Sequence, residues 1–140
     1  MVIYSAPTVV ISYDRGKSVL FQKWEGFATS EIFRKAMEVT FEFMSKENIN
    51  LILSDIREQK VVAPREQEYT KNLALEFLHE RKNLKVAIVG RINSVVMACA
   101  QRYDRSLAAE VKEEVNRFFD DIDEALLWLS QKRDEKKTGI

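Results

Sequence analysis

A single histidine and a single cysteine are the side chains of this sequence best suited to nucleophilic or acid–base catalysis. His79 is followed by Glu80 late in a predicted helix, whereas Cys99 lies between two alanines on the apolar side of another predicted helix. Catalysis by this pair requires the fold to bring the thiol and the imidazole together in a cleft, and nothing in the sequence indicates that they meet. We therefore interpret His79 as an exposed helix residue and Cys99 as a buried, inert thiol. No catalytic residue is predicted.

The sequence also lacks the patterns that bind metals and nucleotides. Asp120, Asp121 and Asp123 stand close together, but helical sequence follows at once and the glycine of a calcium loop is absent, so we interpret these acids as helix caps. No Cys/His cluster offers zinc ligands. The four glycines fit no glycine-rich phosphate loop. We predict neither a metal nor a cofactor.

Three charged residues follow two predicted strands at the point where each strand ends. Asp55 and Arg57 come at the end of an apolar run, and Arg91 comes after a second run. Ligands of open α/β sheets tend to bind beyond the carboxyl ends of parallel strands, and arginines beside a helix N-terminus recognise anions. The sequence therefore offers an anion-binding site at Asp55, Arg57 and Arg91. The alternative is that Asp55 and Arg57 pair with each other and with the loop backbone.

Hydrophobic periodicity predicts the elements that position these residues. Alternation over residues 9–14 and 18–24, around a turn that contains Gly16, predicts an antiparallel hairpin. Short apolar runs predict buried strands, and apolar residues three or four apart predict helices. The predicted strands cover residues 51–55, 86–90 and 115–119. The predicted helix N-caps are Thr29 or Ser30, Asn93 or Ser94, and Asp120 or Asp121, and one further helix begins near Pro64.

The order of these elements predicts the fold class. Strands alternate with helices after the hairpin, which requires crossover connections between parallel strands. We expect an α/β protein, with a mixed β-sheet, an N-terminal antiparallel hairpin and about four helices packed on the sheet. We assign residues 1–130 to one domain and the charged, patternless residues 131–140 to a disordered tail.

The first predicted helix carries apolar side chains over a wide arc. Two stripes, which begin at Ile32 and Phe33, together span about 200° of the helix surface, more than one sheet face needs. Trp24 ends the hairpin just before this helix, and Gly26 permits a sharp turn between them. These side chains either pack in the core or line an apolar pocket. The predicted pocket wall consists of Trp24, Phe27, Phe33, Met37, Phe41 and Met44.

The composition limits the class of protein. Hydrophobic residues make up 46% of the chain and charged residues 31%, which is typical of a globular protein. The 22 basic and 22 acidic residues balance, so we expect no nucleic-acid partner. The lone cysteine forms no internal disulfide, and we see neither a secretory signal nor an apolar run that would span a membrane. We expect a cytoplasmic protein.

Four stretches of the sequence carry a resemblance to a known family. They resemble the bacterial SpoIIAA-like proteins of the STAS superfamily. The stretches are Trp24 to Phe27 (with Thr29 and Phe33), residues 51–57, residues 86–89 and the closing residues 119–129. The similarity extends over about residues 9–130. It implies a STAS-like mixed β-sheet with helices on one side, in agreement with the prediction from periodicity.

The resemblance implies two kinds of function. STAS domains that act as anti-sigma-factor antagonists carry a phosphorylated serine at the start of the helix after the strand that matches residues 51–55. Residues 57–66 contain no serine or threonine. Ser54 comes too early in the chain and Thr70 too late to take this role, so we do not expect this phospho-switch. The SpoIIAA-like subgroup instead resembles CRAL-TRIO lipid-binding domains in fold, which implies an apolar ligand or peripheral membrane association.

We therefore expect a non-enzymatic binding or regulatory module. Its ligand would be a small apolar or lipid-like molecule held between the first helix and the rest of the domain. The alternative is a protein–protein adaptor that acts as a homodimer and buries the same wide arc against a second subunit. A third hypothesis, an enzyme that uses His79 and Cys99, requires the two side chains to meet.

Overall fold

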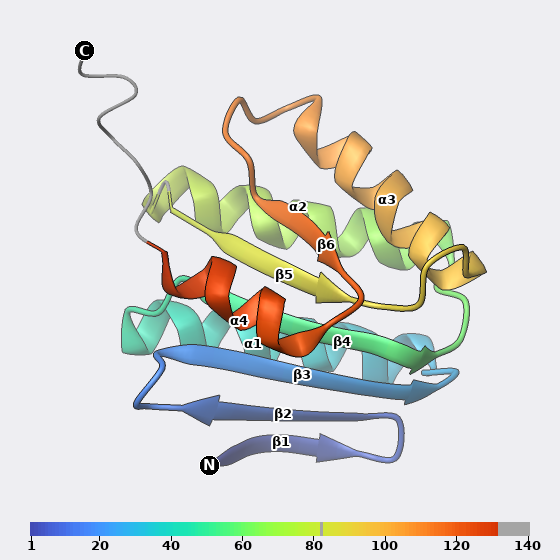
Figure 1. The fold of residues 1–140 in the computed structure, drawn as a ribbon, viewed down its shortest axis with the longest axis horizontal. Coiled ribbons are helices and arrows are strands. Elements are labelled where there is room, and N and C mark those ends of the chain that lie inside the picture. Colours follow the sequence, from blue (N-terminus) through green and yellow to red (C-terminus); the bar gives the residue numbers. More distant parts are fainter. Residues whose placement is uncertain (82, 132–140) are drawn as a thin grey trace.

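The computed structural model describes residues 1–81 and 83–131 (Figure 1). Ten helices and strands follow one another in these residues. All ten lie inside the region assigned to one domain from the sequence, residues 1–130. The tail predicted at residues 131–140 lies outside the described residues, apart from Gln131.

One mixed sheet of six strands forms the centre of the structure, and its strands lie in the order in which the chain makes them. The pairs β1·β2 and β2·β3 are antiparallel, and the last four strands run parallel to one another. The predicted hairpin is confirmed as β2 and β3, with Asp14 opposite Val19. The strands are β1 (Val2–Ala6), β2 (Val9–Asp14), β3 (Val19–Gly26), β4 (Leu51–Gln59), β5 (Lys85–Val89) and β6 (Asn116–Phe119).

Three helices cover one face of the sheet and a fourth covers the other (Figure 1). The connections β3–α1–β4, β4–α2–β5 and β5–α3–β6 each lead to the neighbouring strand on the same side. Because connections between parallel strands are right-handed, α1, α2 and α3 lie on the same face of the sheet. The resemblance implied helices on one side only, and α4 departs from this. The helices are α1 (Ser30–Glu47), α2 (Pro64–Arg81), α3 (Val95–Ala108) and α4 (Ile122–Ser130).

The strand β1 was not predicted from the sequence. It pairs with β2 at the edge of the sheet, where Ala6 lies opposite Val9. None of its residues is fully buried, so its side chains do not have to alternate between apolar and polar types. Ile3, Tyr4 and Ala6 pack against the core only in part, so this edge strand leaves little periodic signal in the sequence.

The joint between β3 and α1 combines a buried indole, a left-handed glycine and a helix cap. Trp24 is only 1% exposed and its ring centroid lies 5.2 Å from that of Phe33 on α1. Gly26 has a φ of 72°, which turns the chain out of the strand. The Thr29 hydroxyl accepts a hydrogen bond from the amide of Ile32, which confirms Thr29 as the N-cap. The corner thus sets the angle at which α1 crosses the sheet.

A buried lysine holds α4 on the opposite face. Lys85, at the start of β5, donates hydrogen bonds to the carbonyl oxygens of Trp128 at 2.7 Å and Gln131 at 3.0 Å. Its ammonium also lies 4.5 Å from the centroid of the Trp128 ring. A positive charge at a helix C-terminus is favoured by the helix dipole. The apolar face of α4 then packs against Leu53 and Ala87 of the sheet.

Polar contacts join α2 to the helices on its two sides. Toward α1, the Arg34 guanidinium donates to Glu66 at 2.7 Å and lies 4.6 Å from the centroid of the Tyr69 ring. Toward α3, the Gln67 side chain donates to the carbonyl oxygen of Cys99 at 2.8 Å. These contacts fix α2 at its flanks, and they do not require close contact between α2 and the sheet beneath it.

The electrostatics of Glu66 link this arrangement to pH. Burial raises the pKa of Glu66, but hydrogen bonds led by the one from Arg34 outweigh it and hold the pKa below the ordinary value of 4.5. A lowered pKa in the folded state means that the carboxylate stabilises the fold above about pH 4.5. This contribution is lost as the pH falls through the folded-state pKa.

We predict that Gly26→Ala lowers the free energy of unfolding by about 1–2 kcal/mol, because a side chain in the left-handed region strains the backbone. A Cβ atom at Gly26 would contact nothing within 4 Å, so the effect isolates the backbone strain. Gly16→Ala is the matched control, since Gly16 has no positive φ and its added Cβ would meet only Asp14, at 3.4 Å. Urea denaturation measures both variants. Equal losses in the two would contradict the assignment.

We also predict that Glu66→Gln lowers the free energy of unfolding at pH 7 by about 1 kcal/mol, a modest value because Arg34 is partly solvated. The difference from the native protein should shrink as the pH is lowered from 5 to 3, since the native carboxylate is then protonated too. Glu68→Gln, on the same helix and exposed, is the control. A difference that is constant between pH 7 and pH 3 would disprove the role given to this carboxylate.

Candidate functional site

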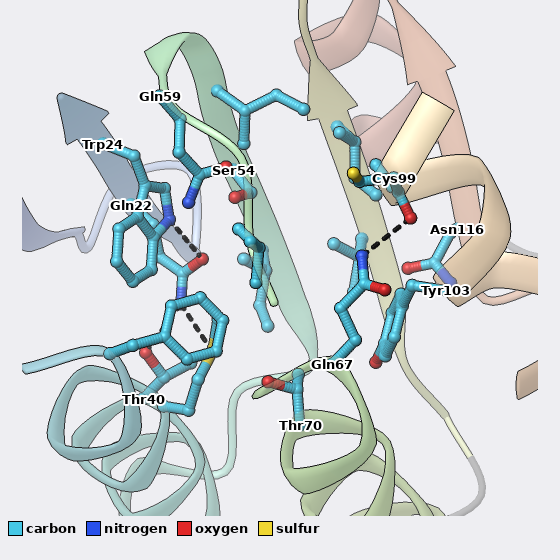
Figure 2. A pocket seen from close by; sticks show the side chains of 18 of the residues that line it. Gln22, Trp24, Thr40, Ser54, Gln59, Gln67, Thr70, Cys99, Tyr103 and Asn116 are labelled. Carbon is cyan, nitrogen blue, oxygen red and sulfur yellow. Dashed lines mark hydrogen bonds between the residues drawn. The ribbon is translucent and has the colours of Figure 1, made fainter. Parts of the chain in front are cut away.

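A cavity of about 110 Å³ lies between the sheet and the three helices that cover it. We call it the central cavity. Its walls come from β3, β4, β5 and β6 on the sheet side and from α1, α2 and α3 on the helix side. Figure 2 shows Gln22, Trp24 and Thr40 on one side of it and Cys99, Tyr103 and Asn116 on the other.

The composition of α2 explains why this space is not filled. In the first half of α2 the buried side chains are those of Glu66 and Thr70, whereas the apolar ones, Ala74, Phe77 and Leu78, come later. The later residues anchor α2, with the ring of Phe77 5.6 Å from that of Phe41 on α1. Above the cavity the helix therefore presents polar side chains where a large apolar residue would otherwise reach the sheet.

Most of the wall is apolar. Ile52, Ile56 and Ile88 line it from the sheet. Four of the six residues predicted from the sequence as a pocket wall line it as well, and they are Trp24, Phe33, Met37 and Phe41. The wide apolar arc of the first helix is thus divided between core packing and the wall of the central cavity.

The other two predicted wall residues lie elsewhere. Met44 is fully buried, with 0% exposure, and packs in the core beyond the end of the cavity. Its position one turn further along α1 carries it past the space under α2. Phe27 is 66% exposed and lines a separate surface depression, because Gly26 turns the chain outward just before it. That either residue contacts a ligand stays a prediction.

A buried amide connects the sheet to α1 on one side of the cavity. Gln22 is 4% exposed, and its Nε2 donates to the Thr40 hydroxyl at 2.8 Å while its Oε1 accepts from the Trp24 indole at 3.3 Å. Thr40 in turn donates to the carbonyl oxygen of Ala36. This network is satisfied by the protein itself, so it shapes the wall and does not need a ligand.

Two hydroxyls that line the cavity have no protein partner. Ser54, opposite Gln22 on the neighbouring strand, is only 8% exposed, and Tyr103 reaches in from α3. Neither hydroxyl makes a hydrogen bond within the described residues. Neither oxygen is among the fully buried polar atoms that lack a partner, so both oxygens are accessible. Burial, with a smaller effect from Asp104, raises the pKa of Tyr103, which keeps its hydroxyl protonated and able to donate.

The cavity carries no charge. None of the described side chains that line it is an aspartate, glutamate, lysine, arginine or histidine. Its polar groups are hydroxyls and amides, such as Gln59 and Gln67, which bind neutral hydrogen-bonding groups. An ion placed there would lose its hydration without gaining a partner of opposite charge. The part of a molecule that fits this space is therefore uncharged.

The three residues of the predicted anion site are already paired. Asp55 accepts two hydrogen bonds from the Arg57 guanidinium, at 2.9 and 2.8 Å, and Lys23 lies 3.3 Å away. Arg91 pairs with Glu58 and donates to the carbonyl oxygen of Arg57. Burial raises the pKa of Asp55, but the bonds from Arg57 outweigh it and lower the pKa below its ordinary value. This arrangement is the paired alternative stated from the sequence.

The structure does not bring His79 and Cys99 together. Cys99 is buried and lines the central cavity, whereas His79 is exposed and lines a separate shallow depression with Val111 and Lys112. Within residues 1–81 and 83–131, no three side chains of the metal-binding types form a group that could hold an ion. Nor does any helix of that part of the chain combine the length and apolar character needed to span a lipid bilayer.

The polar residues of the cavity were not identified from the sequence. A signal for some of them existed, because Gln22 and Ser54 interrupt apolar strands at positions that face inward. Thr40 and Thr70 similarly interrupt the apolar faces of two helices. Polar residues on such faces indicate either an internal hydrogen bond or a polar cavity. Only the structure distinguishes Gln22, which is bonded, from Ser54, which is not.

Comparison with known proteins supports the fold. No protein-family model and no curated protein matches this chain. A crystal structure of an uncharacterized protein of the DUF3478 family with a SpoIIAA-like fold, from Shewanella loihica PV-4, matches with a TM-score of 0.61. The two sequences are 24% identical, and the match covers 91% of this chain and 98% of that chain. Such a likeness supports the fold alone. The chain has a SpoIIAA-like α/β fold, in agreement with the resemblance stated from its sequence motifs.

Proposed function

We propose that this protein is a non-enzymatic binding module that holds a small, mostly apolar molecule in the central cavity. The observation that carries the proposal is Ser54, a residue 8% exposed whose hydroxyl lines a mostly apolar, uncharged cavity and has no hydrogen-bond partner within the described residues. Ser54 Oγ is not among the fully buried polar atoms left without a partner, so it is accessible from the cavity. A ligand with one hydrogen-bonding group would bond to it, a contact worth about 1 kcal/mol, and would also fill the space beneath α2.

The size of the cavity limits the ligand. An apolar cavity of about 150 Å³ accepts a benzene molecule. At about 110 Å³, the central cavity suits a group of comparable or slightly smaller size, such as a short alkyl chain with a hydroxyl or carbonyl. A lipid-like molecule would place one segment of its chain there. Each methylene that enters would contribute about 0.8 kcal/mol, or about fourfold in affinity.

The contacts of α1 favour this proposal over the homodimer adaptor. Phe43 packs edge-on against Tyr13, with 5.4 Å between ring centroids, and Phe41 packs against Phe77. Phe33 and Met44 are buried. The wide apolar arc is therefore occupied inside one chain, which leaves little of it for a second subunit. We expect ligand binding, and not dimer formation through α1, to be its use.

Straight-chain alcohols from 1-butanol to 1-octanol test the cavity. We predict that affinity rises about fourfold per methylene and then levels off when the cavity is full. Ala100→Leu, which fills the cavity from α3, should weaken 1-hexanol binding by about tenfold or more, while the melting temperature stays the same or rises. Ala98→Leu is the matched control, because Ala98 lies on the exposed side of the same helix. Titration calorimetry and thermal unfolding give the two readouts. Equal binding by native protein and Ala100→Leu would rule out the cavity as the site.

Ser54→Ala tests the polar contact. We predict that it weakens 1-hexanol binding by about three- to tenfold, the effect of one lost hydrogen bond in an apolar site, and leaves cyclohexane binding unchanged. The folded protein itself should lose no stability, because the hydroxyl has no partner within the described residues. NMR titration measures both ligands. If Ser54→Ala weakens the binding of 1-hexanol and of cyclohexane to the same extent, Ser54 contributes only to the shape of the cavity, and its hydroxyl has no role in recognition.

A further inference from the structure

We infer that the ligand of the central cavity is an anionic amphiphile, whose acidic end group binds at Lys60 and Arg65 outside the cavity. This inference rests on the proposed function and adds the chemical class of the ligand. It starts from a second space of about 90 Å³, the outer depression, which lies where β4 leads into α2. Phe27, Lys60, Val61 and Arg65 are among the residues that line it.

The outer depression adjoins the central cavity. Phe33 of α1, Gln59 at the end of β4 and Val62 in the following loop line both spaces. Figure 2 shows Gln59 beyond Ser54 along β4, at the end of the cavity nearest to this loop. The two spaces therefore share these three wall residues. A ligand chain bound at Ser54 would reach the outer depression by passing Gln59.

The rim of the outer depression combines exposed apolar and basic side chains. Phe27 is 66% exposed and Val61 48%, although both are large and apolar. Lys60 is exposed and makes no ion pair within the described residues. Arg65 has a side chain that is 77% exposed, and within the described residues its one ion pair is with Glu66, through Nε at 3.2 Å. A ligand end group here would meet apolar surface and two accessible cations.

The one acid that lines the outer depression does not cancel these charges. Glu66 is bound by Arg34 at 2.7 Å through its other carboxylate oxygen, so its charge is already compensated from α1. Lys60 and Arg65 therefore leave the outer depression positive, whereas no charged residue lines the central cavity in the part of the chain that the structure describes. An apolar chain with a carboxylate or phosphate at one end matches this order of environments. A cationic end group does not.

Titration calorimetry of the full chain with three probes of equal chain length tests the inference: 1-octanol, octanoate and octyltrimethylammonium. We expect octanoate to bind at least tenfold more tightly than the ammonium compound, and to lose affinity as salt is raised. The double variant Lys60→Gln/Arg65→Gln should weaken octanoate binding about fivefold or more and change 1-octanol binding by less than twofold. Octyl phosphate in the same assay shows which acidic end group is preferred.

Lys35→Gln/Lys46→Gln is the matched control, because it removes two exposed charges from α1 without touching either space. If it weakens octanoate binding as much as the rim variant, or if neither variant does, the rim site is disproved while the cavity proposal stands. If native protein binds neither octanoate nor 1-octanol, the proposed function fails, and this inference fails with it.

The single cysteine locates the apolar chain. Cys99 is the one cysteine of the sequence and lines the central cavity, on the far side from Gln22 and Trp24. Octanoate should slow its modification by methyl methanethiosulfonate by about fivefold or more at saturation, as expected when most of the protein is occupied. Binding of octanoate without protection of Cys99 would show that the chain stays outside the cavity, and would overturn the inference.

Discussion

One buried amide determines how the rest of the helical layer is arranged. Gln22 projects from β3 into the face covered by helices, where an unsatisfied amide would cost about 1–3 kcal/mol. Its donor and acceptor are satisfied only when Thr40 of α1 lies above it and the Trp24 indole lies beside it. This requirement fixes the position of α1 along the sheet. Phe33 and Met37, on the same side of α1, are thereby aimed at the space under α2.

The central cavity exists because α2 is held by its flanks. Its first half bonds to α1 through Glu66 and to α3 through Gln67, and its apolar anchors come only in the second half. A helix that packed flat on the sheet would need large apolar residues in both halves. The polar first half of α2 leaves the space beneath it open. Its hydrogen bonds to α1 and α3 stabilise the helix in place of apolar contacts with the sheet. Stability and the cavity thus depend on the same contacts.

Charge separates the inside of the site from its outside. The central cavity holds neutral polar groups, whereas Lys60 and Arg65 stand at the rim of the outer depression, in water. Burying a charged side chain without a partner costs far more free energy than leaving it in water. In the empty protein, neutral side chains inside the cavity and charged side chains outside it are therefore the stable arrangement. The same ordering fits an amphiphile with its end group outward. Recognition by such a site would use electrostatics at the rim and apolar contact within.

Local patterns in the sequence were enough to predict most of the elements and the fold class. The hairpin, the buried strands, the helix start at Thr29 and four of the cavity-lining residues follow from periodicity and capping, which are local properties of the chain. The sequence did not reveal β1, whose edge position leaves little periodic signal, nor that α4 covers the opposite face, since periodicity shows that a helix face is buried but not which surface it packs against. The tertiary structure alone decided that Ser54 and Tyr103 share one space with Trp24, because their distances depend on how α1, α2 and α3 stand on the sheet. Whether a polar residue is bonded, like Gln22, or open, like Ser54, is a property of that packing and not of the residue.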